Sequence, residues 1–243
     1  MIYLLIGLSL LFVSIGFIVT ENNAKYILSG YNTMSDEERE NVDIKAYIPY
    51  FKKFHIFLGI SMFVIGSLLT YLVSETAGGI FLIIYPFLAY IYLIWKSTKY
   101  TKGPNTKRNK IGIYILSGIL ILIIADLSYD LQDNTLVCSA EKIEFQGSYG
   151  EVVKQSDIKT IELVNQIPEI TRKINGSSLG TITKGYFKTV DGERVKLILN
   201  SDKEPYILVT KKDGKKIYFS AKEESNTVIY NKIKKTLPNI LYK

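Results

Sequence analysis

Apolar residues form long blocks up to residue 128, and beyond it they alternate with polar residues. The blocks contain four segments with almost no charge, at residues 2–19, 54–73, 79–95 and 111–128. A hydrocarbon core of about 30 Å is crossed by roughly 17–25 helical residues. We therefore expect a multi-pass helical membrane domain over residues 1–128, with four transmembrane helices. The uncharged part of the fourth, Ile111 to Ala125, is the shortest and reaches spanning length by extending through Leu127, Tyr129 and Leu131.

A period of two replaces the apolar blocks after residue 135. About seven short alternating segments follow, separated by turn-forming residues. Gln146-Gly147-Ser148 separates the first two, and Asp191-Gly192 and Asp213-Gly214 each separate a later pair. Asp-Gly between alternating segments is typical of a tight hairpin in which both central residues have positive φ. The pattern predicts an antiparallel, all-β domain over residues 135–240.

A helix is expected at the C-terminal end of this domain, over residues 222–236. Ile229, Ile233 and Leu237 recur every four residues, and Val228 widens the apolar stripe. One apolar stripe suits a helix that packs against the open end of a barrel. The predicted fold class is thus an α-helical membrane domain followed by an all-β barrel with a C-terminal capping helix.

Composition narrows the function. Hydrophobic residues make up 47%, an ordinary value that averages over two different environments. The net charge of +7 is too small to indicate a nucleic-acid partner. The chain has one cysteine and one histidine, which argues against a zinc site, an intrachain disulfide and histidine-based catalysis. We expect no cofactor, no metal and no enzymatic activity.

Basic residues in the connecting loops predict the orientation. Loops 20–53 and 96–110 are rich in lysine and arginine, whereas residues 74–78 between the second and third spans contain none. By the positive-inside rule, the two basic loops are cytoplasmic. Four crossings of the cell membrane then place the β domain outside, whereas three would leave it in the cytoplasm. No basic residue precedes the first apolar block, so we expect an uncleaved helix there and not a signal peptide.

Three polar features carry alternative interpretations. His55 suits either a pH sensor or a wet helix terminus, and Asp126 suits either an ion site or a helix end at the interface. Gly176-Ser177-Ser178-Leu179-Gly180 matches a Gly-x-Ser-x-Gly elbow but lies between β segments without a nearby histidine, which favours a Gly/Ser loop. Pro86 is expected to kink the third span.

Two basic clusters are candidate contacts for a partner or a lipid headgroup. Both are equally compatible with charged, solvated surface. Their residues are Lys211, Lys212, Lys215 and Lys216 around the second Asp-Gly turn, and Arg172 and Lys173.

The first loop carries a distinctive run. Residues 28–38 read Leu-Ser-Gly-Tyr-Asn-Thr-Met-Ser-Asp-Glu-Glu, in which Ser35 and Glu38 have the spacing of a capping box. The second part of the loop, residues 44–54, interleaves aromatic residues with lysines and suits the headgroup region. With Asp43 and Lys45, the run closely resembles the signature of an uncharacterised membrane-domain family of Gram-positive bacteria, over roughly residues 1–97. That resemblance implies a location and an architecture.

The second half resembles the pleckstrin-homology-like (PH-like) domains that bacteria attach to membrane spans. The residues that carry this resemblance lie between about 136 and 237 and are 156–159, 161–163, 174–180, 184–187 and 205–207. It implies a small barrel closed by a helix. Members that bind inositides have basic residues around the first hairpin, whereas Gln146-Gly147-Ser148 is uncharged, so an inositide lipid is not the expected partner.

The expected function is a membrane-anchored, non-enzymatic interaction module. Its β domain would bind a partner protein or an envelope component close to the bilayer. One alternative is an accessory subunit of a membrane transporter or channel, and another is an enzyme with a carboxylate site around Asp126 and Asp130.

Overall fold

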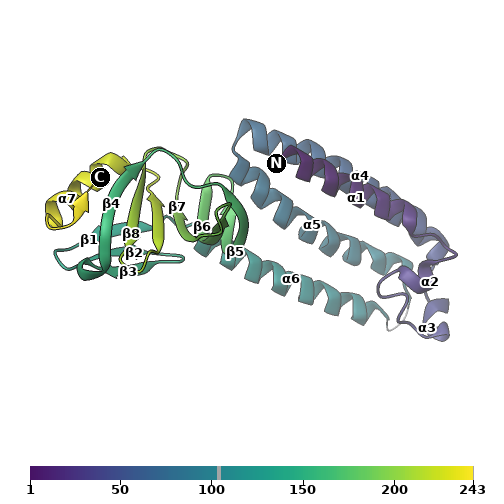
Figure 1. Cartoon of the computed structure of the whole chain (residues 1–243). Coiled ribbons are helices and arrows are strands. Elements are labelled where there is room, and N and C mark those ends of the chain that lie inside the picture. The colour runs from purple at the N-terminus through teal and green to yellow at the C-terminus, as the bar shows by residue number, and fades with distance from the viewer. Residues whose placement is uncertain (103–104, 243) are drawn as a thin grey trace. The chain divides into compact units, whose positions relative to one another are not determined.

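The computed structural model describes residues 1–102 and 105–242 and divides into two compact units (Figure 1). The first unit ends at Ala125 and the second begins at Asp126. The first is helical and the second is built mainly of strands (Figure 1).

Long apolar helices make up the first unit. They are α1 (Ile2–Ile18), α4 (Ile44–Leu72), α5 (Glu75–Ser97) and α6 (Asn105–Asp130), the last of which continues into the second unit. Three stretches of helix are long and apolar enough to cross a membrane, at Ile44–Leu72, Glu75–Tyr100 and Asn109–Asp130. The α1 helix is equally apolar but has 17 residues.

The loops are more helical than the sequence suggested. Residues 44–53 form the first turns of α4, because Asp43 caps the helix by accepting a hydrogen bond from Ala46 N–H at 3.1 Å. The proposed headgroup segment is therefore not a loop. Most of the predicted loop 96–110 is also helical, in α5, in the 3₁₀ turn η1 (Thr98–Tyr100) and in α6, while residues 103 and 104 lie outside the described residues.

Two short helices follow α1, namely α2 (Ala24–Ile27) and α3 (Asp36–Glu40). Ser35 accepts a hydrogen bond from Glu38 N–H at 3.2 Å, and the Glu38 carboxylate accepts one from Ser35 N–H at 2.9 Å. These reciprocal bonds satisfy two backbone donors that a helix start leaves unpaired. The predicted capping box and short helix are confirmed.

Small residues let α1 pack closely along α4. A Cβ at Gly59 would lie 2.5 Å from the Ser9 carbonyl oxygen, and one at Gly16 would lie 3.0 Å from the Lys52 carbonyl. Gly66 likewise faces Leu5. The contacts run in opposite directions along the two chains, so α1 lies antiparallel to α4. Gly59 and Gly66 thus let the two helices approach closely.

The described strands of the second unit form two sheets. The smaller sheet is an antiparallel meander of β1 (Thr135–Cys138), β2 (Lys142–Gln146) and β3 (Glu151–Lys154). The larger sheet has the order β10 (Leu241–Tyr242), β4 (Ile158–Val164), β8 (Tyr206–Lys211), β9 (Lys216–Ser220), β7 (Arg194–Leu199), β6 (Ile182–Thr189) and β5 (Ile170–Leu179). A 3₁₀ turn, η2 (Gln155–Asp157), joins β3 to β4.

This topology corrects the prediction of seven antiparallel strands in a barrel. Among the described residues ten strands are present, and they do not close into a barrel. Two of the strand pairs, β7 with β9 and β10 with β4, are parallel. The reason is that the β8–β9 hairpin folds back so that β9, and not β8, pairs with β7.

The predicted hairpins are present with a different turn. In both Asp-Gly turns only the glycine has positive φ, +84° at Gly192 and +85° at Gly214. Gly192 N–H donates to Thr189 O, and Gly214 N–H donates to Lys211 O. These are three-residue loops that end in a left-handed glycine, the next commonest hairpin connection.

The C-terminal helix α7 (Asn226–Thr236) packs on the main core of this unit. Ile229, Ile233 and Leu237 are buried there with Phe145 and Phe219. The helix begins four residues later than predicted because Ser225 is extended and takes the N-cap position. Ile229, Ile233 and Leu237 of the predicted apolar stripe form the face that α7 buries, whereas Val228 is exposed and does not widen it.

Candidate anion-binding site

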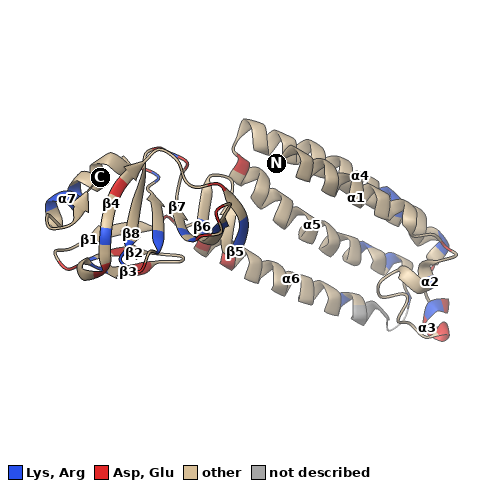
Figure 2. Ribbon diagram, in the orientation of Figure 1, with Lys and Arg blue, Asp and Glu red and all other residues tan. Residues whose placement is uncertain are grey.

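A pocket of about 450 Å³ in the β unit is lined mainly by basic side chains. It draws residues from β3, β6, β7, β8 and β9. Figure 2 shows blue segments for lysine and arginine on the strands of this unit. The lining residues are Gly150, Glu151, Tyr186, Arg194, Lys196, Lys211, Lys215, Lys216 and Ile217. We call this the basic pocket.

Strand register decides which of these side chains share a face. Tyr186 pairs with Lys196 on β7, and Lys196 pairs with Ile217 on β9. Because directly paired residues project from the same face of a sheet, these three side chains lie on one side. Arg194, two residues from Lys196, projects to that side as well. Lys216 pairs with Val195 and projects to the other face.

A carboxylate lies between two lysines in the pocket. Glu151 Oε2 is 2.6 Å from Lys196 Nζ, and Glu151 Oε1 is 2.8 Å from Lys211 Nζ. Burial raises the pKa of Glu151, but its hydrogen bonds with the two ammonium groups outweigh burial and leave the pKa below its usual value. The same contact raises the pKa of Lys211. Glu151 and Lys211 are therefore both charged near neutral pH.

Tyr186 supports the cations of the pocket wall. The Arg194 guanidinium carbon lies 4.4 Å from the centroid of the Tyr186 ring, and Lys196 Nζ lies 4.9 Å from it. Cations at these distances are attracted to the electron-rich face of the ring. Among the described residues, Arg194 has no acidic partner.

The remaining charges pair at the margin. Lys215 Nζ is 2.8 Å from Asp213 Oδ2, and Lys216 Nζ is 2.6 Å from Glu193 Oε2. These acidic groups are 45% and 53% exposed, whereas Lys196 is 6% exposed. The pocket therefore combines a buried, fully paired floor with an open, loosely paired rim.

The sequence candidates separate into two groups. Lys211, Lys215 and Lys216 line the basic pocket. Lys212 is exposed beside a different, shallow depression, and its backbone N–H donates to Asp157 O. Arg172 and Lys173 are exposed on β5 and do not line the pocket.

Three important members of the pocket were not identified from the sequence. Arg194 and Lys196 lie within the alternating pattern of β7 and read as its solvent-facing residues. Glu151 comes from the other sheet. The i, i+2 spacing of Arg194 and Lys196 indicates that both side chains project from one face of the strand. The residues that meet them in the pocket follow only from the sheet order.

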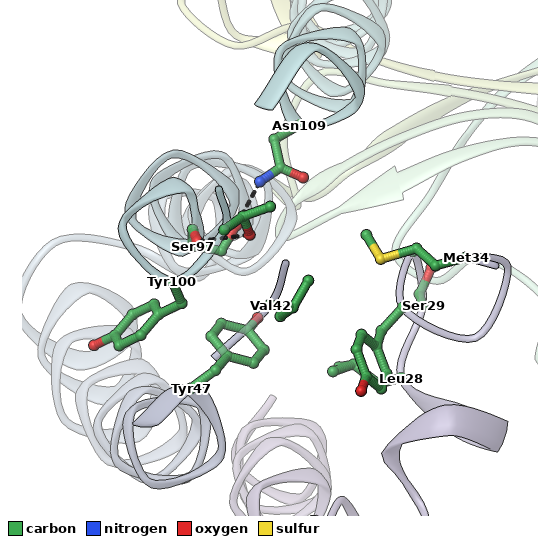
Figure 3. A pocket seen from close by; sticks show the side chains of 11 residues that line it. Leu28, Ser29, Met34, Val42, Tyr47, Ser97, Tyr100 and Asn109 are labelled. Atoms are coloured by element: carbon green, nitrogen blue, oxygen red, sulfur yellow. Dashed lines mark hydrogen bonds between the residues drawn. The ribbon is translucent and has the colours of Figure 1, made fainter. Parts of the chain in front are cut away.

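A second, smaller cavity lies in the helical unit, with a volume of about 70 Å³ (Figure 3). Most of its wall comes from the signature run and from the ends of helices. Its residues are Leu28, Ser29, Gly30, Tyr31, Met34, Val42, Tyr47, Ser97, Tyr100, Thr101 and Asn109. Asn109 Nδ2 donates to Ser97 Oγ at 3.2 Å, and the Tyr47 and Tyr100 rings meet edge to face at 5.5 Å (Figure 3).

The signature run is held over this cavity by Arg39 of α3. Its guanidinium donates to the carbonyl oxygens of Tyr31 and Asn32, both at 3.3 Å, and pairs with Asp36 at 2.7 Å. Nearby, Val42 and Thr101 form an isolated β-bridge. The run therefore packs between the helix ends. The cavity that it lines has room for a few water molecules.

His55 is not at a wet helix terminus, as one interpretation held. It is fully buried inside α4, where Nδ1 donates to the Phe51 carbonyl at 2.8 Å and Nε2 lies 3.1 Å from the Tyr90 hydroxyl. Because α4 begins at Ile44, His55 lies three turns into the helix and next to Gly16 of α1.

The Gly-x-Ser-x-Gly run is not a loop. Residues 176–179 belong to β5, and Ser178 Oγ lies 3.0 Å from the Thr183 hydroxyl on β6. Gly176 pairs with Gly185 so closely that a side chain on either would meet the opposite backbone. The glycines thus serve strand pairing.

The membrane-edge carboxylates are placed differently from one another. Asp126 is exposed on α6, whereas Asp130 at its end accepts a hydrogen bond of 2.5 Å from Ser148. Within residues 1–102 and 105–242, no group of three or more His, Cys, Asp or Glu side chains is positioned to hold a metal ion.

Comparison with known proteins finds a match over part of the chain. Residues 6–101 match a family model described as a domain of unknown function (DUF3784). This covers the region in which the sequence resembles an uncharacterised membrane-domain family. No curated protein and no solved structure matches the chain.

Proposed function

We propose that the chain is a membrane-anchored, non-enzymatic binding module. Its apolar helices hold it in the bilayer, and its β unit binds an anionic group of a partner protein or an envelope component. The observation that carries the proposal is the basic pocket, in which Arg194 and Lys215 present cations that no buried acid neutralises. Confinement at the membrane raises the effective concentration of such a pair.

Four crossings are the proposed arrangement of the helical unit. Besides the three spanning stretches, α1 lies antiparallel to α4 from Leu5 against Gly66 to Gly16 against Lys52. A helix that follows this part of α4 crosses most of the same thickness, since 17 residues extend about 26 Å. The basic residues near the α2, α3 and η1 ends support a cytoplasmic position for that side and an external β unit.

The relation of the β unit to PH-like domains remains part of the proposal. A three-stranded antiparallel sheet, a second sheet and a C-terminal helix packed on the core support it. The open sheet and the parallel β7–β9 pair depart from it. A shared fold would in any case leave the ligand to be argued from the site itself.

The test measures anion binding by the whole chain. Purified protein in nanodiscs of phosphatidylcholine is titrated with a fluorescent polyglutamate peptide and with a fluorescent polyphosphate. We expect at least one probe to bind, and we expect Arg194→Ala with Lys215→Ala to weaken it about tenfold. The control is Arg172→Ala with Lys173→Ala, which removes the same charge from exposed positions outside the pocket. Equal effects of the two double variants would mean that the pocket binds anions no better than ordinary charged surface does.

A transporter or channel accessory role is the second candidate. It is favoured by two polar contacts between α4 and α5, His55 with Tyr90 at 3.1 Å and Ser61 with Tyr85 at 2.6 Å. Polar groups inside spanning helices often mark ion or substrate paths. Replacing His55 by Phe would alter ion flux in reconstituted vesicles under this candidate, and would leave anion binding by the β unit unchanged under the first.

A further inference from the structure

The net charge of the basic pocket follows from counting its cations and the acidic groups that pair with them. On the pocket face lie Arg194, Lys196, Lys211 and Lys215, and Glu151 neutralises one of these four charges. Asp213 at the turn neutralises a second through Lys215. Lys216 and Glu193 pair with each other and add nothing. Four cations minus two acids leave two positive charges in excess, one on Arg194 and one shared by Lys196 and Lys211.

The two halves of the pocket differ in how readily they accept a new anion. Glu151 holds two ammonium groups at 2.6 and 2.8 Å, and Lys196 is almost completely buried. The Asp213–Lys215 pair is exposed, and exposed pairs are easily exchanged for another partner. An incoming anion would therefore displace Asp213 and leave Glu151 in place.

Among the described residues of the pocket, the cation without an acidic partner is an arginine, and its guanidinium packs against an aromatic ring. The Tyr186 ring lies beneath Arg194, so its guanidinium loses little freedom when it binds a ligand. A guanidinium presents parallel donors that match two oxygens of a phosphate group. The pocket volume falls within the roughly 300–1,000 Å³ of sites that hold small organic molecules, which leaves room for more than the phosphate itself.

We infer that the basic pocket binds a phosphate monoester, with its phosphate between Arg194 and Lys215 and with Glu151 still paired to Lys196 and Lys211. Such a group carries a charge of about −1.5 to −2 near pH 7, which matches the excess positive charge of the pocket face. A single carboxylate or a phosphodiester carries half as much. This inference rests on the proposed function and narrows its ligand to one chemical class.

Glu151 is a specificity residue in this arrangement. It lowers the positive charge of the floor, so that the pocket does not retain every anion, and it fixes Lys196 and Lys211 beside the phosphate. Replacing it with glutamine adds one positive charge without changing the shape of the side chain. The Glu151→Gln protein should bind phosphate monoesters several-fold more tightly and should discriminate less between them and carboxylates.

The experiment uses the full chain in a neutral maltoside detergent at low salt, titrated with glycerol 3-phosphate by calorimetry. We expect saturable binding that falls at least tenfold in Arg194→Ala and in Lys215→Ala. Lys212→Ala is the matched control, because it removes an equal charge from an exposed residue of the same turn that does not line the pocket. A loss in Lys212→Ala as large as in the other two would overturn the assigned geometry.

Three further probes separate the remaining outcomes. Tighter binding of glutarate than of glycerol 3-phosphate would overturn the phosphate class and leave an anion-binding module standing. No binding of any probe, with no difference among the variants, would overturn both. Nanodiscs that contain phosphatidic acid, compared with nanodiscs of phosphatidylcholine alone, show whether the phosphate monoester belongs to a lipid or to a soluble molecule. Arg194-dependent binding only to the former indicates a lipid headgroup, and binding of glycerol 3-phosphate without that lipid indicates a soluble ester.

Discussion

Asn200 forms hydrogen bonds with both backbone groups of Asn134. Its Oδ1 accepts from Asn134 N–H and its Nδ2 donates to Asn134 O, each at 2.8 Å. Both residues are buried, and 66 positions separate them in the chain. The side chain thus supplies to the segment before β1 the two bonds that a neighbouring strand would otherwise supply.

Replacement of Asn200 by alanine should therefore destabilise the β unit. The change leaves a donor and an acceptor of Asn134 buried without partners, at roughly 1–3 kcal/mol for each group. We expect a loss of about 3 kcal/mol, measured as a lower unfolding temperature of the β unit by calorimetry. Asn239→Ala, at an exposed position, is the control. An unchanged transition in the Asn200 variant would show that water replaces the amide.

Close packing of α1 on α4 gives a second prediction. A leucine at Gly59 would place its Cβ within 2.6 Å of Val13 Cγ2 as well as against the Ser9 carbonyl, so the helices must separate. Gly7→Leu on α1 is the matched control, because nothing lies within 4 Å of a Cβ there. Cysteines introduced at Leu5 and Gly66, which face each other across the two helices, in a Cys138→Ser background, should cross-link in the Gly7 variant and much less in the Gly59 variant. Equal cross-linking would contradict the close contact.

Acid should weaken the β unit partly through Glu151. Its pKa is lower in the folded protein than the ordinary 4.5, so folding stabilises the ionised form. That contribution is complete above pH 4.5 and disappears as the pH falls through the folded pKa. Glu151→Gln should be less stable than the unmodified chain by about 2 kcal/mol at pH 7, because Lys196 stays buried without its partner.

The same variant should lose less stability on acidification. Unfolding temperatures between pH 7 and pH 3 would converge for the two proteins at the acidic end. Glu169→Gln, which removes one exposed carboxylate, should run parallel to the unmodified chain. Curves that stay parallel for Glu151→Gln would mean that the carboxylate is not stabilised by its two lysines.

Local patterns account for the parts of the fold that were predictable. Charge-free blocks locate the long helices, and the Gly192 and Gly214 turns locate two hairpins, because both signals arise from neighbouring residues. Helix α4 was predicted to begin ten residues later than it does. Tyr47 and Lys52 are amphipathic, so they suit both a helix and a headgroup loop. That difference is also why His55 was taken for a terminal residue.

The basic pocket depended on information that no local pattern contains. Lys211 and Lys215 stood out because they flank an Asp-Gly turn. Arg194 and Lys196 meet them only because β7 pairs in parallel with β9, across the whole β8 hairpin. Glu151 enters from the other sheet, which packs on the same core. Long-range pairing of this kind is set by the competition among all strands, and single-strand alternation does not encode it.

Sidedness provides the last prediction. In a Cys138→Ser background, single cysteines are placed at Glu37 in the signature run and at Lys173 on β5, both of them exposed and outside the basic pocket. With four crossings, a membrane-impermeant maleimide should label the Lys173→Cys protein in intact cells and the Glu37→Cys protein only after lysis. Labelling of both only after lysis would mean that α6 does not cross and that the anionic partner is cytoplasmic. Labelling of Glu37→Cys in intact cells would show that the orientation is the reverse of the proposed one. The lysines at that end of the helices would then face outward, against the positive-inside rule.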